Sequence, residues 1–436
     1  MDQNKFLTQR TMNYWLLGLS YATLYFSRYN LSSTHKELAN FLHWSYSNYG
    51  VIIGFALLVY GLTVFFAGPI CDKIGGKKAL LIGMFGSIIC NVVFGATFFL
   101  VKDGYTNPSL YYGLNLSDLL RIMIFIWSTN YFFQSFGALS VVKVNSAWYT
   151  KEERGKFAGK FGMLIQVGRI LVLVACPWIL YVLPWPFVFF IPAASTLIMM
   201  FLVWHLIEDK PESLGISYGS ETKHLSIKDS IKTIIESPYI YLIVGSLFVA
   251  FFNGMIRNGL EHYIARFFTD QFNVGARQLN TFFPYIIYSI LTPGLMMLAS
   301  GISGFSSDKY FGSRRFPIIV GSFLLVIIGL FCLMLDMKNA YFSCAFLVFT
   351  MFALQAVNNI LMGTLTVDLA GKNVSGTVTG LFDGIQYFGG SFSCFVIGII
   401  LRQTKEWHNW PAFLLIAALL GLAASVKLAK KEKNGN

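Results

Sequence analysis

Two arginines, Arg28 and Arg257, each stand in the middle of a long hydrophobic stretch of this sequence. A guanidinium group in the hydrocarbon of a membrane costs at least ~2.5 kcal/mol, so such residues usually have a function. Arginine stays charged, and its planar fork matches a carboxylate or a phosphate. Because the two stretches resemble each other, the sequence predicts a transporter that binds an anion with one arginine from each of two matching halves.

Polar residues share a helix face with each of these arginines. Tyr21, Tyr25 and Arg28 follow an i, i+4, i+7 spacing, so the phenol hydroxyls either bind oxygens of the anion or belong to an interfacial aromatic belt. Asn253 and Glu261 lie one turn before and one turn after Arg257. Glu261 therefore either joins the binding site or neutralises Arg257 within the helix.

Further candidates lie in other apolar stretches. Arg169 either adds positive charge to the site or pairs with a neighbouring helix, and Asp383 either carries a coupling proton or neutralises an arginine. Amides are weaker candidates, because they also join helices in membranes. The amides considered are Asn130 and Gln134, spaced i, i+4, and the adjacent pair Asn358 and Asn359.

Composition places these residues in an all-α membrane protein. Of 436 residues, 55% are hydrophobic and only 12% are charged, whereas soluble proteins carry about 25% charged residues. Stretches of ~20 apolar residues, which can cross a ~30 Å hydrocarbon core, recur along the chain. We predict twelve transmembrane helices, at 12–33, 48–70, 79–101, 119–142, 157–181, 185–207, 238–265, 280–303, 316–335, 341–363, 376–401 and 410–429.

The net charge of +12 indicates topology rather than binding to nucleic acid. Most of the 33 lysines and arginines fall in segments that share the side of the N-terminus, which predicts that both termini are cytoplasmic. We expect a monomeric, multi-pass protein of a bacterial inner membrane. The six cysteines show no metal-binding spacing, and the sequence contains no phosphate-binding P-loop or nucleophile elbow, so we expect neither an enzyme nor a metal or cofactor.

The sequence indicates that the chain arose by an internal duplication. A polar linker at 208–236 separates an N-terminal half at 1–207 from a C-terminal half at 237–436, which ends in a basic tail. A Gly-x3-Asp-Lys motif follows the second span and again the eighth. We expect these motifs, together with the basic loop before the fifth span, to form cytoplasmic turns that fasten helix ends. The residues in this group are Gly68, Asp72, Lys73, Gly304, Asp308 and Arg154.

The duplicated motif resembles the signature of the major facilitator superfamily, and further motifs resemble its organophosphate:phosphate antiporter family. That family includes bacterial glycerol-phosphate and hexose-phosphate transporters. The matching motifs are Tyr21-x3-Tyr25-x2-Arg28-x-Asn30, Trp148-Tyr-Thr-Lys151-x2-Arg154-Gly155, Asp209-Lys-Pro211-Glu-Ser-Leu-Gly215, Arg257-Asn-Gly259, and Gly376-Thr-x2-Gly380 through Gly389-Gly390. They cover most of the chain in the family's order.

The resemblance implies two six-helix pseudo-repeats that work by alternating access, with Arg28 and Arg257 as the phosphate-binding arginines. It also implies exchange of a small organophosphate for inorganic phosphate. The chain departs from the family at Val64, where a lysine is common, at Ile165, where a histidine is common, and near Gly254, where a tyrosine is expected; the eighth span has no acidic residue. Two alternatives therefore stay open: a proton-coupled transporter of another anion such as a carboxylate, and a transporter-like sensor of a sugar phosphate.

Overall fold

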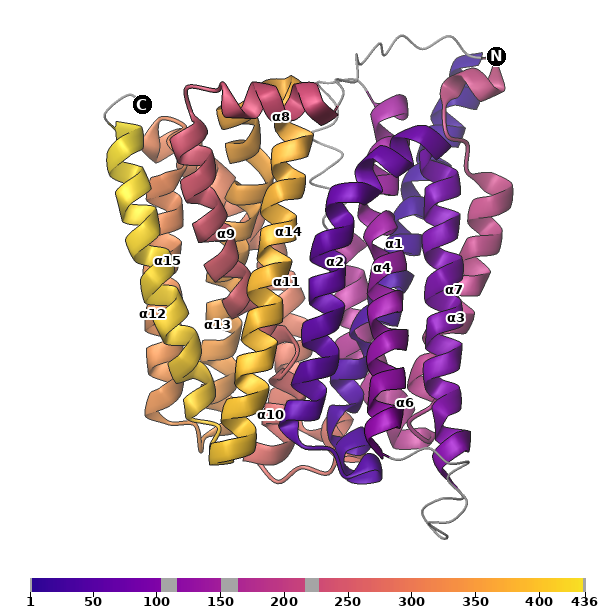
Figure 1. Ribbon diagram of the computed structural model, residues 1–436, viewed down its shortest axis with the longest axis vertical. Coiled ribbons are helices and arrows are strands. Elements are labelled where there is room, and N and C mark those ends of the chain that lie inside the picture. Colours follow the sequence, from indigo (N-terminus) through magenta and orange to yellow (C-terminus); the bar gives the residue numbers. More distant parts are fainter. Residues whose placement is uncertain (1, 103–115, 150–163, 216–226, 434–436) are drawn as a thin grey trace. The chain divides into compact units, whose positions relative to one another are not determined.

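The computed structural model describes residues 2–102, 116–149, 164–215 and 227–433, and these parts of the chain are largely helical (Figure 1). The elements of the N-terminal half are α1 (Asp2–Leu42), α2 (Tyr46–Ile74), α3 (Gly76–Lys102), α4 (Leu116–Trp148), η2 (Leu171–Ala175), α6 (Cys176–Val182) and α7 (Phe187–Leu206). The linker contains η3 (Pro211–Leu214) and α8 (Ile227–Ile235). The remaining elements are α9 (Ile240–Glu261), α10 (Ile264–Gln271), η4 (Ala276–Thr281), α11 (Phe283–Phe311), α12 (Phe316–Leu335), α13 (Ala340–Asn359), η5 (Ile360–Thr364), α14 (Leu365–Thr404) and α15 (Asn409–Lys433).

The all-helical architecture confirms the predicted fold class. Ten helices of the described chain are long and apolar enough to cross a membrane. The two other predicted spans coincide with α1 and α4, which are also long and carry more polar side chains. Helices are the expected form because lipid offers no hydrogen bonds to the backbone, so each span must satisfy its own N–H and C=O groups.

The chain forms two compact units. One comprises residues 1–43 and 66–222, and the other comprises residues 44–65 and 223–436. Their boundary at 222/223 falls within the predicted linker, whereas the first part of α2 packs with the second unit. The division of the chain at 207 and 237 stays a prediction.

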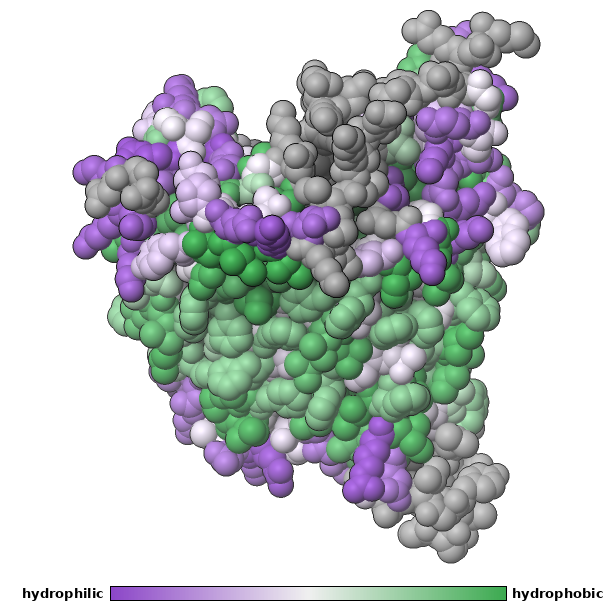
Figure 2. Space-filling model, turned by 45° about the horizontal axis from the view of Figure 1, so that its top comes forward, coloured by the Kyte–Doolittle hydropathy of each residue, from purple (hydrophilic) through white to green (hydrophobic). Residues whose placement is uncertain are grey.

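Aromatic side chains fill the core of each unit. In the first unit, the Phe94 ring lies 5.0 Å from Trp127 and 4.6 Å from Phe189, between centroids. In the second unit, Phe267 lies 5.2 Å from Trp410. Large hydrophobic side chains also remain exposed along the spans, and Figure 2 shows them as green surface. In a membrane protein such a surface faces lipid.

The seventh and the eleventh spans depart from simple rods. The seventh span was predicted to reach residue 265, but α9 ends at Glu261 and the short helix α10 follows. Within α14, Gly371 adopts φ 71° and ψ 169°, which separates the end of the tenth span from the eleventh. Only glycine enters this region of backbone conformation at low cost.

Candidate functional site

Arg28 lies fully buried in α1 of the first unit, against α4. Its Nε donates a hydrogen bond to Oε1 of Gln134 at 3.1 Å, and its Nη2 donates to the backbone oxygen of the same residue at 3.3 Å. The guanidinium carbon lies 5.3 Å from the centre of the Tyr25 ring and 5.9 Å from that of Tyr131. Amide oxygens and aromatic faces stabilise a cation without cancelling its charge.

A buried polar network continues from Gln134 through three helices of the same unit. Gln134 Nε2 donates to the Leu24 carbonyl at 3.0 Å and to Ser87 Oγ at 2.8 Å. Ser87 donates in turn to Asn130 Oδ1 at 2.8 Å, and Asn130 Nδ2 donates to the Ser27 carbonyl at 3.0 Å. Of the two predicted amides, Gln134 therefore contacts the arginine directly, while Asn130 joins α1, α3 and α4.

The N-terminal half supplies no negative charge at this depth. Its six predicted spans contain no aspartate and no glutamate, although they contain Arg28 and Arg169. Carboxylates of these spans therefore cannot neutralise either arginine. A positive charge held in this way suits the binding of an anion.

The two predicted tyrosines lie inside the first unit. Tyr21 and Tyr25 are each 6% exposed, and their ring centroids lie 5.3 Å apart. Tyrosines of an interfacial belt would instead face the lipid headgroups. The Tyr25 ring adjoins the Arg28 guanidinium, so the structure brings these two predicted residues together.

Arg169 lies at a close approach between the fifth span and α1. A Cβ on the preceding residue, Gly168, would lie 2.8 Å from Cβ of Tyr25, so the backbones meet closely here. Arg169 is half-buried, and the π-helical segment η2 begins two residues later. Single-turn π-helices are frequent at functional sites. Both predicted roles of Arg169 stay predictions.

The second unit holds Arg257 in a different electrostatic setting. Its Nε donates to Glu261 Oε1 at 3.1 Å within α9, so the predicted neutralising pair is present. Its Nη1 donates to Asn358 Oδ1 at 3.3 Å, and the same oxygen accepts a hydrogen bond from Gln386 Nε2 at 3.0 Å. Arg257 and Glu261 keep 16% and 8% of their side chains exposed.

Asn253 and Asp383 complete the predicted set in this unit. Asn253 is fully buried one turn before Arg257, and neither its Nδ2 nor its Oδ1 has a hydrogen-bond partner among the described residues. Asp383 is half-buried in α14, one turn before Tyr387, whose ring stacks on Tyr60 with centroids 4.0 Å apart. The roles of Asn253 and Asp383 stay predictions.

The two arginines occupy equivalent places in the two repeats. Arg28 in the first span bonds to an amide of the fourth span, Gln134. Arg257 in the seventh span bonds to an amide of the tenth span, Asn358. The members of each equivalent pair are six spans apart, so the two repeats share an arginine–amide contact as well as the Gly-x3-Asp-Lys motif.

Comparisons with known proteins show the family. The family model of the Major Facilitator Superfamily matches residues 17–394. The chain belongs to the Major Facilitator Superfamily. It is therefore a multi-pass membrane transporter by family, and not an enzyme.

Two relatives and one solved structure are distant in sequence from this superfamily member but match along almost the whole chain. The membrane sensor protein UhpC of Salmonella typhimurium is 22% identical, over 94% of this chain and 89% of its own. The glycerol-3-phosphate transporter of Bacillus subtilis is 24% identical, over 93% of this chain and 88% of its own. A solved bacterial homologue of the human lysosomal transporter Spinster, inward-facing and unoccupied, matches with a TM-score of 0.73 and 15% identity, over 97% of this chain and 98% of its own.

One departure from the antiporter family has a structural reason in this superfamily member. Gly254 of α9 lies against α14, where an added Cβ would overlap the carbonyl oxygen of Gln386. Gly389 of α14 lies equally close to the α9 backbone at Phe251. A tyrosine at 254 would not fit between these helices.

The superfamily signature lies in helices, which corrects the predicted turns. The first copy belongs to α2, which continues to Ile74, and the second belongs to α11, which continues to Phe311. Both helices stop at a glycine with positive φ, Gly75 at 90° and Gly312 at 58°, a common way to end a helix. The residues concerned are Gly68, Asp72 and Lys73 in α2, and Gly304 and Asp308 in α11; Arg154 and the Asp72 side chain lie outside the described part of the structure.

Asp308 of α11 bridges to a basic residue, Arg315. It accepts a hydrogen bond from Arg315 Nη1 at 2.8 Å and one from Ser313 Oγ at 2.9 Å. Arg315 Nε also donates to Asp368 Oδ2 at 2.6 Å. This cluster ties the end of α11 and the start of α12 to the start of α14.

Two acidic residues that sequence reasoning missed cap helices at equivalent places. Asp209, just after the sixth span, accepts a hydrogen bond from the Lys77 backbone N–H at 2.6 Å, at the start of α3. Glu432, at the end of the twelfth span, accepts from the Arg315 N–H at 2.9 Å and the Phe316 N–H at 3.4 Å, at the start of α12. Each repeat thus holds the start of its third span with a carboxylate at or just beyond the end of its sixth.

Proposed function

We propose that this protein is a secondary transporter that exchanges a small organophosphate for inorganic phosphate by alternating access. Arg28 and Arg257 each bind the phosphoryl group through charge-assisted hydrogen bonds. Tyr21 and Tyr25 orient the anion beside Arg28. We further propose a bacterial inner-membrane location with both termini cytoplasmic, on the basis of the lysine and arginine distribution.

The repeated arginine–amide contact is the observation that carries this proposal. Gln134 and Asn358 orient each guanidinium without adding a negative charge to it. Positive charge also exceeds negative charge inside the spans. The charged residues that lie more than one turn from either end of a predicted span are three arginines and two acidic residues. They are Arg28, Arg169, Arg257, Glu261 and Asp383. An anionic substrate restores the balance, and the similarity to a glycerol-3-phosphate transporter supports an organophosphate.

The first test measures uptake of radiolabelled phosphate into proteoliposomes, with and without phosphate trapped inside. Exchange predicts uptake only when internal phosphate is present, and unlabelled organophosphates should compete for it. Uptake driven by a proton gradient without internal phosphate would instead identify a proton-coupled carrier, in which Asp383 is the first residue to substitute.

The second test separates the two arginines from general effects of substitution. Arg28→Lys and Arg257→Lys keep the charge but lose the planar fork, so each should reduce phosphate exchange severely while the protein stays folded. Arg121→Lys is the matched control, because Arg121 sits in α4 with 79% of its side chain exposed. If either lysine variant exchanges phosphate at the wild-type rate, the arginine that it replaces does not bind the substrate.

Sensing is a second candidate, favoured by the similarity to the sensor UhpC along nearly the whole chain. A sensor would bind an organophosphate without moving it across the membrane. Ligand-dependent thermal stabilisation combined with no exchange in proteoliposomes, in protein that remains folded, would favour sensing over transport.

A further inference from the structure

The linker helix α8 presents three distinct sides. Ser230 and Ile234 are buried, whereas Ile231 and Ile235 are 47% and 63% exposed. At about 100° per residue, the exposed isoleucines form an apolar stripe next to the buried one. The remaining side is polar and exposed, with Asp229 and Lys232. A short helix in water has no reason to expose an isoleucine pair beside a buried face.

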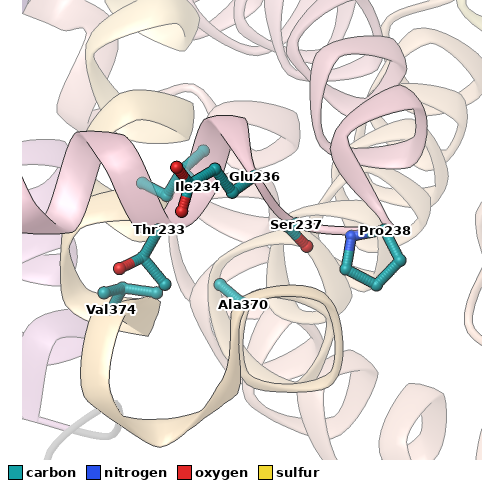
Figure 3. A pocket seen from close by; sticks show the side chains of 7 residues that line it. All are labelled: Thr233, Ile234, Glu236, Ser237, Pro238, Ala370 and Val374. Atoms are coloured by element: carbon teal, nitrogen blue, oxygen red, sulfur yellow. The ribbon is translucent and has the colours of Figure 1, made fainter.

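The buried side of α8 is already occupied by protein of the same unit. Thr233 and Ile234 face Ala370 and Val374 of α14 across a cavity of about 310 Å³ (Figure 3). Figure 3 also shows Glu236 and Ser237 lining this cavity as the chain leaves α8. The exposed isoleucines lie outside this contact with α14.

The chain connection places the isoleucine stripe at the end of a membrane span. Ile235 precedes the first residue of α9, Ile240, by five positions, which span at most ~18 Å. Figure 1 shows α8 lying across the spans of its unit rather than along them. The first turns of α9 also expose hydrophobic side chains, with Tyr241, Val244 and Phe248 exposed by 45%, 45% and 60%. The apolar side of α8 thus continues a surface that faces lipid.

Positive side chains lie at this level as well. Lys431 Nζ of α15 lies 5.7 Å from the centre of the Tyr241 ring, and tyrosine is typical of the membrane interface. Lys232 has 72% of its side chain exposed on the polar side of α8, where its Nζ lies 3.9 Å from Glu236 Oε1 in an exposed ion pair that lipid phosphates can replace. Lysines beside an apolar helix face match the phosphate groups of anionic lipids.

We propose that α8 is an interfacial helix whose partner is the bilayer itself. Ile231 and Ile235 enter the boundary between headgroups and acyl chains, and Lys232 lies at the lipid phosphates. The linker is then held at the membrane surface while its inner side packs on α14. This proposal does not depend on which solute the protein transports.

The experiment uses the full chain in proteoliposomes of phosphatidylcholine with phosphatidylglycerol. A nitroxide is attached to Ile235→Cys and, as the matched control on the same helix, to Asp229→Cys. Wild-type protein treated in parallel gives the background from native thiols. The label at 235 should collide with dissolved oxygen several-fold more than with a water-soluble nickel complex, and the label at 229 should show the opposite preference.

Two results would overturn the proposal. If the label at 235 is as open to the nickel complex as the label at 229, α8 lies in water. If it is shielded from oxygen and nickel alike, another protein surface covers the stripe. Repeating the measurement with Lys232→Glu tests the lipid phosphates, because the label at 235 should then move towards the nickel complex, and an unchanged depth would exclude that contact.

Discussion

Replacing Gln134 with glutamate should weaken phosphate binding, because it adds a negative charge beside Arg28. The substitution puts a carboxylate oxygen where the amide oxygen now lies, 3.1 Å from Arg28 Nε. With an effective dielectric constant of about 20, unit charges at this separation attract by about 5 kcal/mol. Desolvation of the new carboxylate offsets part of this energy. A difference of ~1.4 kcal/mol changes an affinity tenfold. If about a quarter of the attraction between Arg28 and the new carboxylate remains after desolvation, the affinity for phosphate should fall tenfold or more.

The assay compares the phosphate KM of Gln134→Glu and Gln134→Leu in the exchange reaction, together with their thermal unfolding. Leucine removes the hydrogen bonds without adding charge and leaves Arg28 and Ser87 with fewer partners, at about 1–3 kcal/mol for each buried group left unpaired. It should therefore lower Tm with a smaller effect on KM. Glutamate also loses the hydrogen bonds that Gln134 Nε2 donates to the Leu24 carbonyl and to Ser87 Oγ, so it should lower Tm as well, but its added charge should raise KM more than leucine does. An unchanged phosphate KM in folded Gln134→Glu would refute the assignment of Arg28 as an anion-binding residue.

Two further substitutions test the second unit and the helix caps. Glu261→Gln removes the carboxylate that competes with the proposed substrate for the Arg257 guanidinium. The phosphate KM should therefore fall, by about tenfold if ~1.4 kcal/mol of attraction is released, and turnover should slow. A raised KM would mean that Glu261 itself contributes to binding. Asp209→Ala removes the hydrogen-bond acceptor at the start of α3 and should lower the free energy of unfolding by about 1 kcal/mol. Thermal unfolding in detergent should show this as a lower Tm. The control variant Glu212→Ala, at an exposed position, should keep the wild-type Tm. Equal Tm values for both would show that the cap contributes nothing to stability.

The spans and the two arginines were predictable because their signals are local. A charged residue inside an apolar run is visible without any knowledge of its neighbours, and Arg28 and Arg257 are both of this kind. The i, i+4 spacing of Asn130 and Gln134 likewise follows from one helix alone. The bond from Arg28 to Gln134 joins residues 106 positions apart, so only the packing of α1 on α4 reveals it.

The helix ends and caps were harder to predict because competing patterns look alike. Asp72 and Asp308 follow apolar runs and resemble loop residues, yet their helices continue until a glycine with positive φ stops them. Asp209 and Glu432 stand among charged neighbours in the linker and the tail, where most acidic side chains are simply solvated. Their capping role depends on the backbone N–H groups that the fold brings to them.

The two repeats differ at one position that affects how much each arginine contributes to anion binding. Both arginines are oriented by an amide three helices later, but only Arg257 has a carboxylate in hydrogen-bond contact from its own helix. A phosphoryl group that approaches Arg257 must compete with Glu261 for the same fork, whereas no carboxylate from the spans of its own half competes at Arg28. Arg28 should therefore supply most of the affinity, and Arg257, with its replaceable partner, should respond to the presence of substrate. An exchanger benefits from this asymmetry. When the anion leaves, Glu261 can pair with Arg257 again, which lowers the free energy of the empty site.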